Sequence, residues 1–235
     1  MIYLYHLISL FLVLIVVPCF VLGSLFSRNK LRRLSDHFGL FFFSDSPKSS
    51  QKTIWFHALS FGEVVGVTPT INLLKKNRPH DRIILSVTTD SGFEAAKRKL
   101  PDIDGLFFFP LDCFPFNWIA IKNIKPDLFV LVDTGFWPGF IHFLYLKGVP
   151  ILLFNGRISS RSIRKYVVFR LFFSQLFNWF TVLCMQNPHS RSKLESIGVD
   201  KSRLMMVGDP KFDTLSNSSQ EKRNKVRGKL GIAPL

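Results

Sequence analysis

The sequence of 235 residues predicts an α/β fold in which helices cover both faces of a mainly parallel, doubly wound sheet. Short apolar runs rich in β-branched and aromatic residues recur along the chain, and segments with helical periodicity separate them. Continuous apolar runs such as 128–132 are typical of strands that are buried on both faces. One long apolar segment precedes this pattern, so we expect a membrane helix before the α/β domain.

The predicted elements alternate regularly, because each crossover between parallel strands needs a helix. Strands are expected near 53–57, 83–89, 106–109, 128–132, 150–154, 181–185 and 204–207. Helices are expected near 64–77, 92–100, 115–124, 137–147, 162–178 and 189–197.

The N-terminal segment 1–27 contains no Asp, Glu, Lys or Arg and is long enough to span a bilayer. The charged residues that come next are all basic: Arg28, Lys30, Arg32 and Arg33. The positive-inside rule keeps such a cluster in the cytoplasm, so we expect a single N-terminal anchor in the cytoplasmic membrane and a cytoplasmic domain behind it. The alternative is a hydrophobic hairpin in the membrane interface, which Pro18 and the nearby Tyr3 and Tyr5 favour.

The chain divides into four predicted parts by composition. They are a membrane anchor at 1–27, a basic juxtamembrane segment and linker at 28–52, an α/β domain at 53–215, and a polar linker or shortened start of another domain at 216–235.

The net charge of +15 predicts a polyanionic partner. An anionic membrane surface is favoured over nucleic acid, because a membrane segment is expected and no nucleic-acid-binding motif is present. The three cysteines, Cys19, Cys113 and Cys184, are far apart and have no His partner at zinc-ligand spacing, so neither a disulfide framework nor a metal site is expected. Phosphate-loop, dinucleotide-binding, zinc-protease and nucleophile-elbow motifs are absent, which disfavours the corresponding enzyme classes.

Glu63 follows the first predicted strand at the junction with a helix. Ligands bind outside the carboxyl ends of parallel strands, so this acid is a candidate catalytic group. Ser60 and Glu63 also have the spacing of a capping box, in which both side chains would satisfy backbone donors at the helix start. The residues alone leave both interpretations open.

The interval 134–194 contains eight basic residues and no acidic one. Its segment 155–162 places arginines and serines between a strand and a helix, where guanidinium groups and helix N-terminal amides can hold phosphate or carboxylate. The candidate anion-binding residues here are Arg157, Ser159, Arg161, Ser162, Arg164 and Lys165. The alternative is a solvated basic helix face.

Two more candidates follow strands. Asp133 ends an apolar strand, and it is a candidate site residue or an N-cap for the next helix. Lys211 follows the last predicted strand, where by pattern alone it is an ordinary loop lysine.

Several segments together resemble the 3-deoxy-D-manno-octulosonic acid (Kdo) transferases of lipopolysaccharide synthesis. They are Trp55-x-His57-Ala58-x-Ser60-x-Gly62-Glu63, Val87-Thr88-Thr89, Leu131-Val132-Asp133-Thr134-x-x-Trp137-Pro138, Asn155-x-Arg157-x-Ser159-x-Arg161-Ser162 and Gly208-x-x-Lys211-Phe212-Asp213. The resemblance covers most of the chain.

This resemblance implies the Rossmann-like N-terminal, acceptor-binding half of a two-domain GT-B glycosyltransferase at the bacterial inner membrane. The implied donor is CMP-Kdo and the implied acceptor is a phosphorylated lipid A precursor, with no metal or other cofactor. Glu63 would be the general base, and Asp133 and Lys211 would support the transition state. Ser60 and Gly62 would join the acceptor-binding residues.

Two departures from the family pattern accompany the resemblance. The family's Glu-Thr-Glu is Asp133-Thr134-Gly135 here, so one acid is shorter and the other is missing. We also expect this chain to lack the family's donor-binding second domain, which would then have to come from elsewhere, for example from a separately encoded partner. The alternatives are a non-catalytic membrane-bound remnant that binds anionic glycolipid, and another GT-B lipid glycosyltransferase.

Overall fold

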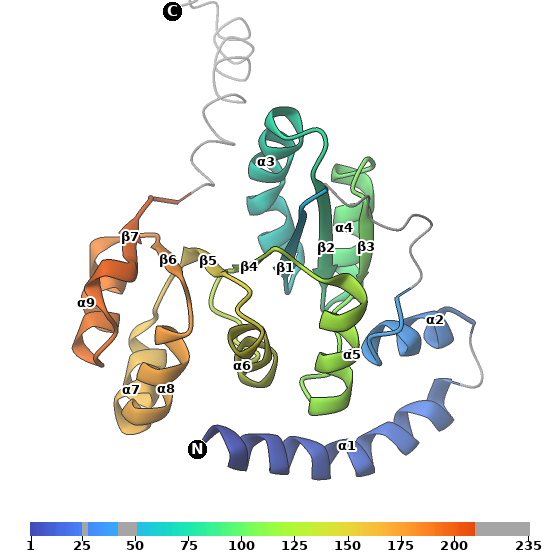
Figure 1. Ribbon diagram of the computed structural model, residues 1–235, viewed down its shortest axis with the longest axis horizontal. Helices are drawn as coiled ribbons and strands as arrows, with labels where there is room; N and C mark the ends of the chain where they lie inside the picture. The colour runs from blue at the N-terminus through green and yellow to red at the C-terminus, as the bar shows by residue number, and fades with distance from the viewer. Residues whose placement is uncertain (25–27, 42–50, 210–235) are drawn as a thin grey trace, which may run out of the picture.

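The computed structural model describes residues 1–24, 28–41 and 51–209, and these contain a seven-stranded sheet in the order β3-β2-β1-β4-β5-β6-β7. All neighbouring strands are parallel, which confirms the predicted doubly wound class (Figure 1). The strands are β1 (Thr53–Ala58), β2 (Arg82–Val87), β3 (Gly105–Phe108), β4 (Leu128–Val132), β5 (Ile151–Gly156), β6 (Val182–Met185) and β7 (Leu204–Met206).

Helices cover both faces of the sheet. α3 and α4 lie on one side, and α5, α6, α7 and α8 lie on the other (Figure 1). The helices are α1 (Ile2–Ser24), α2 (Arg28–His37), α3 (Phe61–Asn77), α4 (Asp90–Lys99), α5 (Phe114–Ile124), α6 (Pro138–Leu146), α7 (Ser160–Val168), α8 (Arg170–Asn178) and α9 (Pro188–Ser196). A short 3-10 helix at Lys201–Arg203 precedes β7.

The core has two layers because side chains alternate across each strand. On β1, Ile54 and Phe56 join the cluster under α3 and α4, whereas Trp55 joins the cluster under α5 and α6. On β4, Val130 and Leu131 divide in the same way. The continuous apolar runs of the sequence are therefore strands buried on both faces, as predicted.

The predicted helix 162–178 is two helices, α7 and α8, with the break at Phe169. In a continuous helix, Tyr166 and Phe173 would lie about 10 Å apart along the helix axis, because seven residues separate them. The break instead brings the rings of Tyr166 and Phe173 to a centroid distance of 4.2 Å, and Arg170 Nε donates to the Ile197 carbonyl. Tertiary packing therefore divides a segment whose local sequence is helical throughout.

Helix α2 lies in the segment 28–52, for which the sequence predicted only a basic juxtamembrane stretch and a linker. Lys211 and the segment 216–235 lie outside the described residues.

Helix α1 contacts α5 and α6 (Figure 1). Tyr5 Oη donates to Asp112 Oδ2 at 2.6 Å, and His6 Nε2 lies 2.9 Å from His142 Nδ1. Asp112 also accepts from the backbone N–H groups of Gly139 and Phe140, so one carboxylate caps α6 and holds α1. In the part of the chain that the structure describes, no helix combines the length and the apolar character needed to cross a membrane, so the predicted spanning anchor is not confirmed.

Candidate active site

Three neighbouring strands, β1, β4 and β5, bring the candidate residues to one edge of the sheet. The chain runs from β1 to β2 on one side, while β4 pairs with β1 on the other, so the carboxyl ends of β1 and β4 form a topological switch point. Glu63 and Asp133 flank this point and line the same small cavity, together with Gly62. The two predicted acids therefore lie together, although 70 residues separate them in the sequence.

Glu63 is held at the start of α3 by the backbone before it. Leu59 N donates to Glu63 Oε2 at 2.6 Å, and Ser60 Oγ lies 3.4 Å from Oε1. The Ser60 side chain makes no cap hydrogen bond to the backbone, and Glu63 accepts from Leu59, the residue before the N-cap, so the serine half of the predicted capping box is absent. A carboxylate fixed at the positive end of a helix dipole can act as a proton acceptor and remain anchored.

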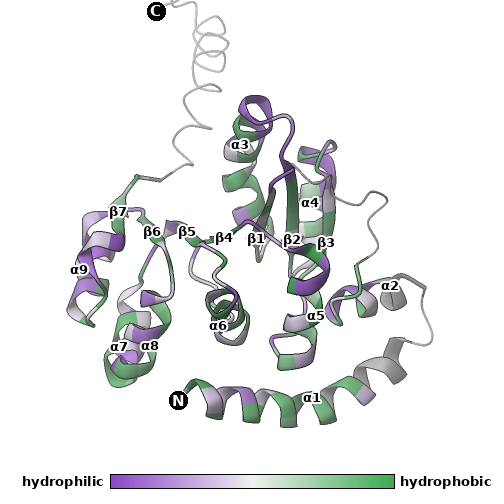
Figure 2. Ribbon diagram, viewed as in Figure 1, coloured by the Kyte–Doolittle hydropathy of each residue, from purple (hydrophilic) through white to green (hydrophobic). Residues whose placement is uncertain are grey.

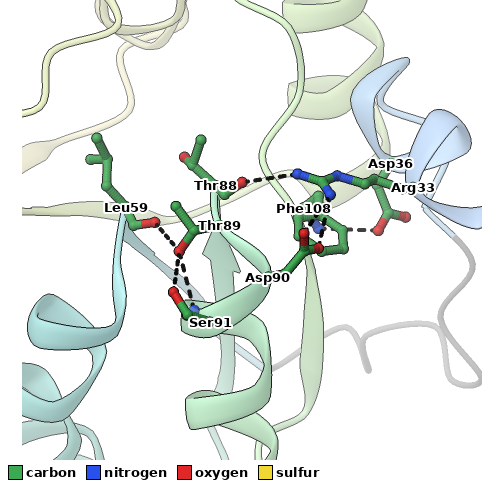
Figure 3. A network of polar contacts seen from close by, with 9 residues as sticks. Arg33, Asp36, Leu59, Thr88, Thr89, Asp90, Ser91 and Phe108 are labelled. Carbon is green, nitrogen blue, oxygen red and sulfur yellow. Dashed lines mark hydrogen bonds and ion pairs between the residues drawn. The ribbon is translucent and has the colours of Figure 1, made fainter. Parts of the chain in front are cut away.

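Leu59, whose N–H holds Glu63, is itself fixed by the loop between β2 and α4. The Leu59 carbonyl accepts from the backbone N–H groups of Thr88 and Thr89 and from Thr89 Oγ1 (Figure 3). Thr89 Oγ1 also accepts from Gly92 N and so caps α4. The backbone of Leu59 thus links Glu63 to the start of a second helix, α4.

Helix α2 is docked on the neighbouring loop. Arg33 Nη1 donates to both carboxylate oxygens of Asp90, at 2.8 and 2.9 Å, and the guanidinium carbon lies 4.5 Å from the Phe108 ring centroid (Figure 3). Asp36 Oδ2 accepts from Phe108 N at 3.0 Å. The basic segment after the N-terminal helix is therefore part of the scaffold on this side of the site.

Asp133 has a left-handed backbone conformation, with φ of 61°. Its Oδ1 accepts from Thr134 N at 2.7 Å and from Thr134 Oγ1 at 3.2 Å, and Thr134 Oγ1 also lies 3.1 Å from the Arg157 carbonyl. The interpretation of Asp133 as an N-cap is wrong, because Trp137 is the N-cap of α6. At Gly135, where the family has an acid, a Cβ atom would overlap the Leu59 side chain.

His57 and Trp137 fix the loop that follows Asp133. Trp137 Nε1 donates to His57 Nε2 at 2.9 Å, while His57 Nδ1 lies 3.2 Å from the Ser86 carbonyl. Burial lowers the pKa of His57 to about 3, so the ring is neutral at pH 7. The Trp-x-His motif therefore ties β1 to the loop 133–137, and His57 has a structural role.

The basic candidates lie beyond the end of β5. Arg157, Arg161, Arg164 and Lys165 are exposed, and none of the four forms an ion pair within the described residues. Ser159 caps α7 by accepting from Ser162 N at 3.0 Å, and the two hydroxyl oxygens are 2.8 Å apart. Two serines are thus engaged with each other and four cations face solvent, so anion binding stays a prediction.

Other basic residues of the same interval are structural. Lys193 Nζ donates to the Ile158 carbonyl, and Arg191 pairs with Glu195. Lys211 cannot be placed, because it lies outside the described residues. Over residues 1–24, 28–41 and 51–209, no group of three or more His, Cys, Asp or Glu side chains could hold a metal ion.

Asn155 and Leu59 belong to the site, but the sequence did not single them out as site residues. Asn155 lines the cavity with Glu63 and Asp133 and has φ of 60°. An Asn directly at a strand end is a usable signal, because Asn adopts the left-handed conformation more readily than other non-glycine residues. Leu59 acts through its backbone, which no side-chain pattern reveals.

The chain is similar to known proteins in sequence and, more distantly, in fold. A 3-deoxy-D-manno-octulosonic acid transferase of Haemophilus influenzae is 29% identical over 203 residues, which are 86% of this chain and 47% of the relative. One of Chlamydophila psittaci is 27% identical over 180 residues, 76% of this chain and 42% of the relative. The chain thus spans about half the length of these curated relatives.

Among solved structures, a UDP-N-acetylglucosamine 2-epimerase from Rickettsia bellii matches the fold with a TM-score of 0.53 at 12% sequence identity. The match covers 78% of this chain and 52% of the epimerase chain. A UDP-GlcNAc 2-epimerase from Neisseria meningitidis matches with a TM-score of 0.50 at 12% sequence identity, over 75% of this chain and 54% of the epimerase chain. Similarity at this level shows a shared fold only.

The family model for 3-deoxy-D-manno-octulosonic-acid transferase (kdotransferase) matches residues 32–214, which include the whole described sheet and both acids of the cavity. The chain belongs to the Kdo transferase family and corresponds to its N-terminal domain.

Proposed function

We propose that this chain is the acceptor-binding half of a glycosyltransferase that transfers Kdo from CMP-Kdo to a phosphorylated lipid A precursor. The observation that carries the proposal is the anchored Glu63 carboxylate at the switch point of the sheet, in one cavity with Asp133. A second domain or a separately encoded partner supplies most of the donor site.

In the proposed reaction, Glu63 accepts the proton of an acceptor hydroxyl as its oxygen attacks the anomeric carbon of Kdo. The bond from that carbon to the CMP phosphate breaks, and its electron pair leaves with CMP. Asp133 and Lys211 support the transition state, Lys211 by offsetting negative charge on the leaving phosphate or the Kdo carboxylate. No metal or other cofactor takes part.

The acceptor's phosphate groups would bind the basic segment after β5. Arg157, Arg161, Arg164 and Lys165 are exposed, and Ser159 and Ser162 lie at the N-terminus of α7, where the helix dipole favours an anion. Ser60 and Gly62, at the start of α3, complete the proposed acceptor site.

We also propose that the domain works at the cytoplasmic face of the bacterial inner membrane. The part of α1 between Met1 and Ile15 exposes many large apolar side chains, as does the α7–α8 junction, where Val168 is 75% and Leu171 83% exposed. Figure 2 shows hydrophobic stretches along the ribbon of α1, α7 and α8. Exposed apolar side chains beside exposed cations suit an anionic lipid surface. Nucleic acid is not expected as a partner.

One observation favours a second candidate function. Gly135 stands where the family pattern has an acid. A non-catalytic protein that binds anionic glycolipid would keep the basic segment without needing both acids.

The acceptor proposal predicts that the double variant Arg161→Gln/Arg164→Gln binds deacylated, phosphorylated lipid A precursor about tenfold more weakly than the wild type. Isothermal titration calorimetry at several salt concentrations should also show a shallower salt dependence, because two cations are lost.

The matched control is Lys97→Gln/Arg98→Gln, which removes the same charge from the exposed end of α4. The control should bind like the wild type. Equal affinity in both double variants would remove the segment after β5 from the acceptor site.

A further inference from the structure

Asn155 is a buried polar residue that the fold leaves unsatisfied beside Glu63. The residue is only 8% exposed, and its Oδ1 atom is buried without a hydrogen-bond partner. Neither carboxamide atom makes a hydrogen bond within the described residues. Asn117 Oδ1 is likewise buried without a partner, but the Nδ2 of Asn117 donates to Asp112. A buried amide oxygen without a partner is unfavourable, and Asn155 differs from Asn117 because it lines the cavity with Glu63 and Asp133, where a ligand could supply the missing hydrogen bond.

The backbone of Asn155 is unfavourable as well. Its φ of 60° lies in the left-handed region, which glycine adopts without strain. Asp133, on the neighbouring strand, has nearly the same φ. Two non-glycine residues in this conformation, side by side at strand ends and lining one cavity, are typical of a functional site.

The cavity has room for one small group. Its volume is about 20 Å³, which is enough for one water molecule or one hydroxyl group. The carboxylates of Glu63 and Asp133 disfavour an anion there. A neutral hydroxyl suits the lining, because it can give its proton to a carboxylate and still accept a hydrogen bond.

We infer that Asn155, together with Glu63 and Asp133, forms a binding subsite for the reacting hydroxyl of the acceptor sugar. Rotation of the carboxamide exchanges its oxygen and nitrogen, so the buried position can offer an N–H donor. That N–H donates to one lone pair of the hydroxyl oxygen, while the hydroxyl proton points to Glu63 and the second lone pair attacks. The hydrogen bond strengthens as negative charge develops on the oxygen.

This inference rests on the proposed function, and its test separates the two. The variant is Asn155→Gly, which removes the carboxamide and relieves the left-handed backbone. The matched control is Lys125→Gly, since Lys125 has φ of 50° at the C-terminus of α5, at the opposite end of the sheet. Calorimetry would compare deacylated lipid A precursor with its analogues that each lack one hydroxyl, and thermal unfolding would be followed for all proteins.

The wild type and Lys125→Gly should bind one deoxy analogue about tenfold more weakly than the parent sugar. Asn155→Gly should bind the parent sugar more weakly and should discriminate against the deoxy analogue by no more than about threefold, because only the hydrogen bond to Glu63 remains. Its unfolding temperature should be no lower than that of the wild type. Undiminished tenfold discrimination in Asn155→Gly, or a lowered unfolding temperature, would overturn the inference while leaving the proposed function standing. A wild type that binds no phosphorylated sugar would overturn both.

Discussion

Replacement of Glu63 by Gln is expected to slow Kdo transfer by about 10²- to 10⁴-fold, which is the usual contribution of a general base. Gln keeps the size of the side chain and an oxygen that can accept from Leu59 N, so the start of α3 should be preserved. It cannot accept a proton from the acceptor hydroxyl. The measurement is the initial rate of transfer from CMP-Kdo by this chain fused to the donor-binding domain of a relative.

Glu94→Gln is the matched control, because Glu94 is exposed on α4. This variant should transfer Kdo at the wild-type rate. Acceptor affinity should be nearly unchanged in both variants, since the lost function is proton transfer. Full activity of Glu63→Gln would remove Glu63 as the base.

The largest expected loss of stability is that of His57→Ala. The substitution leaves a cavity in the core and removes the acceptor of Trp137 Nε1, so the free energy of unfolding should fall by about 3–5 kcal/mol. Chemical denaturation at pH 7 would measure it. His80→Ala is the control, because His80 is exposed in the turn before β2, and it should unfold like the wild type. Equal stability of the two variants would show that His57 does not hold the loop 133–137.

The same residue predicts how stability depends on pH. Burial lowers the pKa of His57 from 6.5 to about 3, so between these values the unfolded chain binds the proton and the folded chain does not. The free energy of unfolding is therefore highest above pH 6.5, where His57 is neutral in both states. It falls as the pH drops toward 3, by up to about 5 kcal/mol. Burial also lowers the pKa values of His6, His37 and His142, which adds to the loss in acid. Denaturation at pH 7.5 and pH 4.5 should show a smaller difference for His57→Ala than for the wild type.

Much of the fold could be predicted because its signals are local. Short apolar runs mark the strands, and a run such as 128–132 has no polar position that would expose a face. The placement of Glu63 and Asp133 at one edge also followed, since carboxyl ends of parallel strands lie together.

The remaining features depend on contacts between distant segments. The break at Phe169 results from packing of α8, and helix α2 is docked through the ion pair of Arg33 with Asp90. The sequence assigned Asp133 two competing roles, and only the position of the α6 N-cap at Trp137 excludes one of them. Asn155 was missed because its unsatisfied carboxamide exists only in the folded chain.

The most direct test of the proposed function is product formation. The chain would be fused to the donor-binding domain of a relative, supplied with CMP-Kdo and lipid A precursor, and the lipid analysed by mass spectrometry. We predict a product heavier by at least one Kdo residue, and no product when CMP-Kdo is omitted. An unmodified lipid would contradict the proposal if the relative's own N-terminal domain, in the same fusion, gives the product.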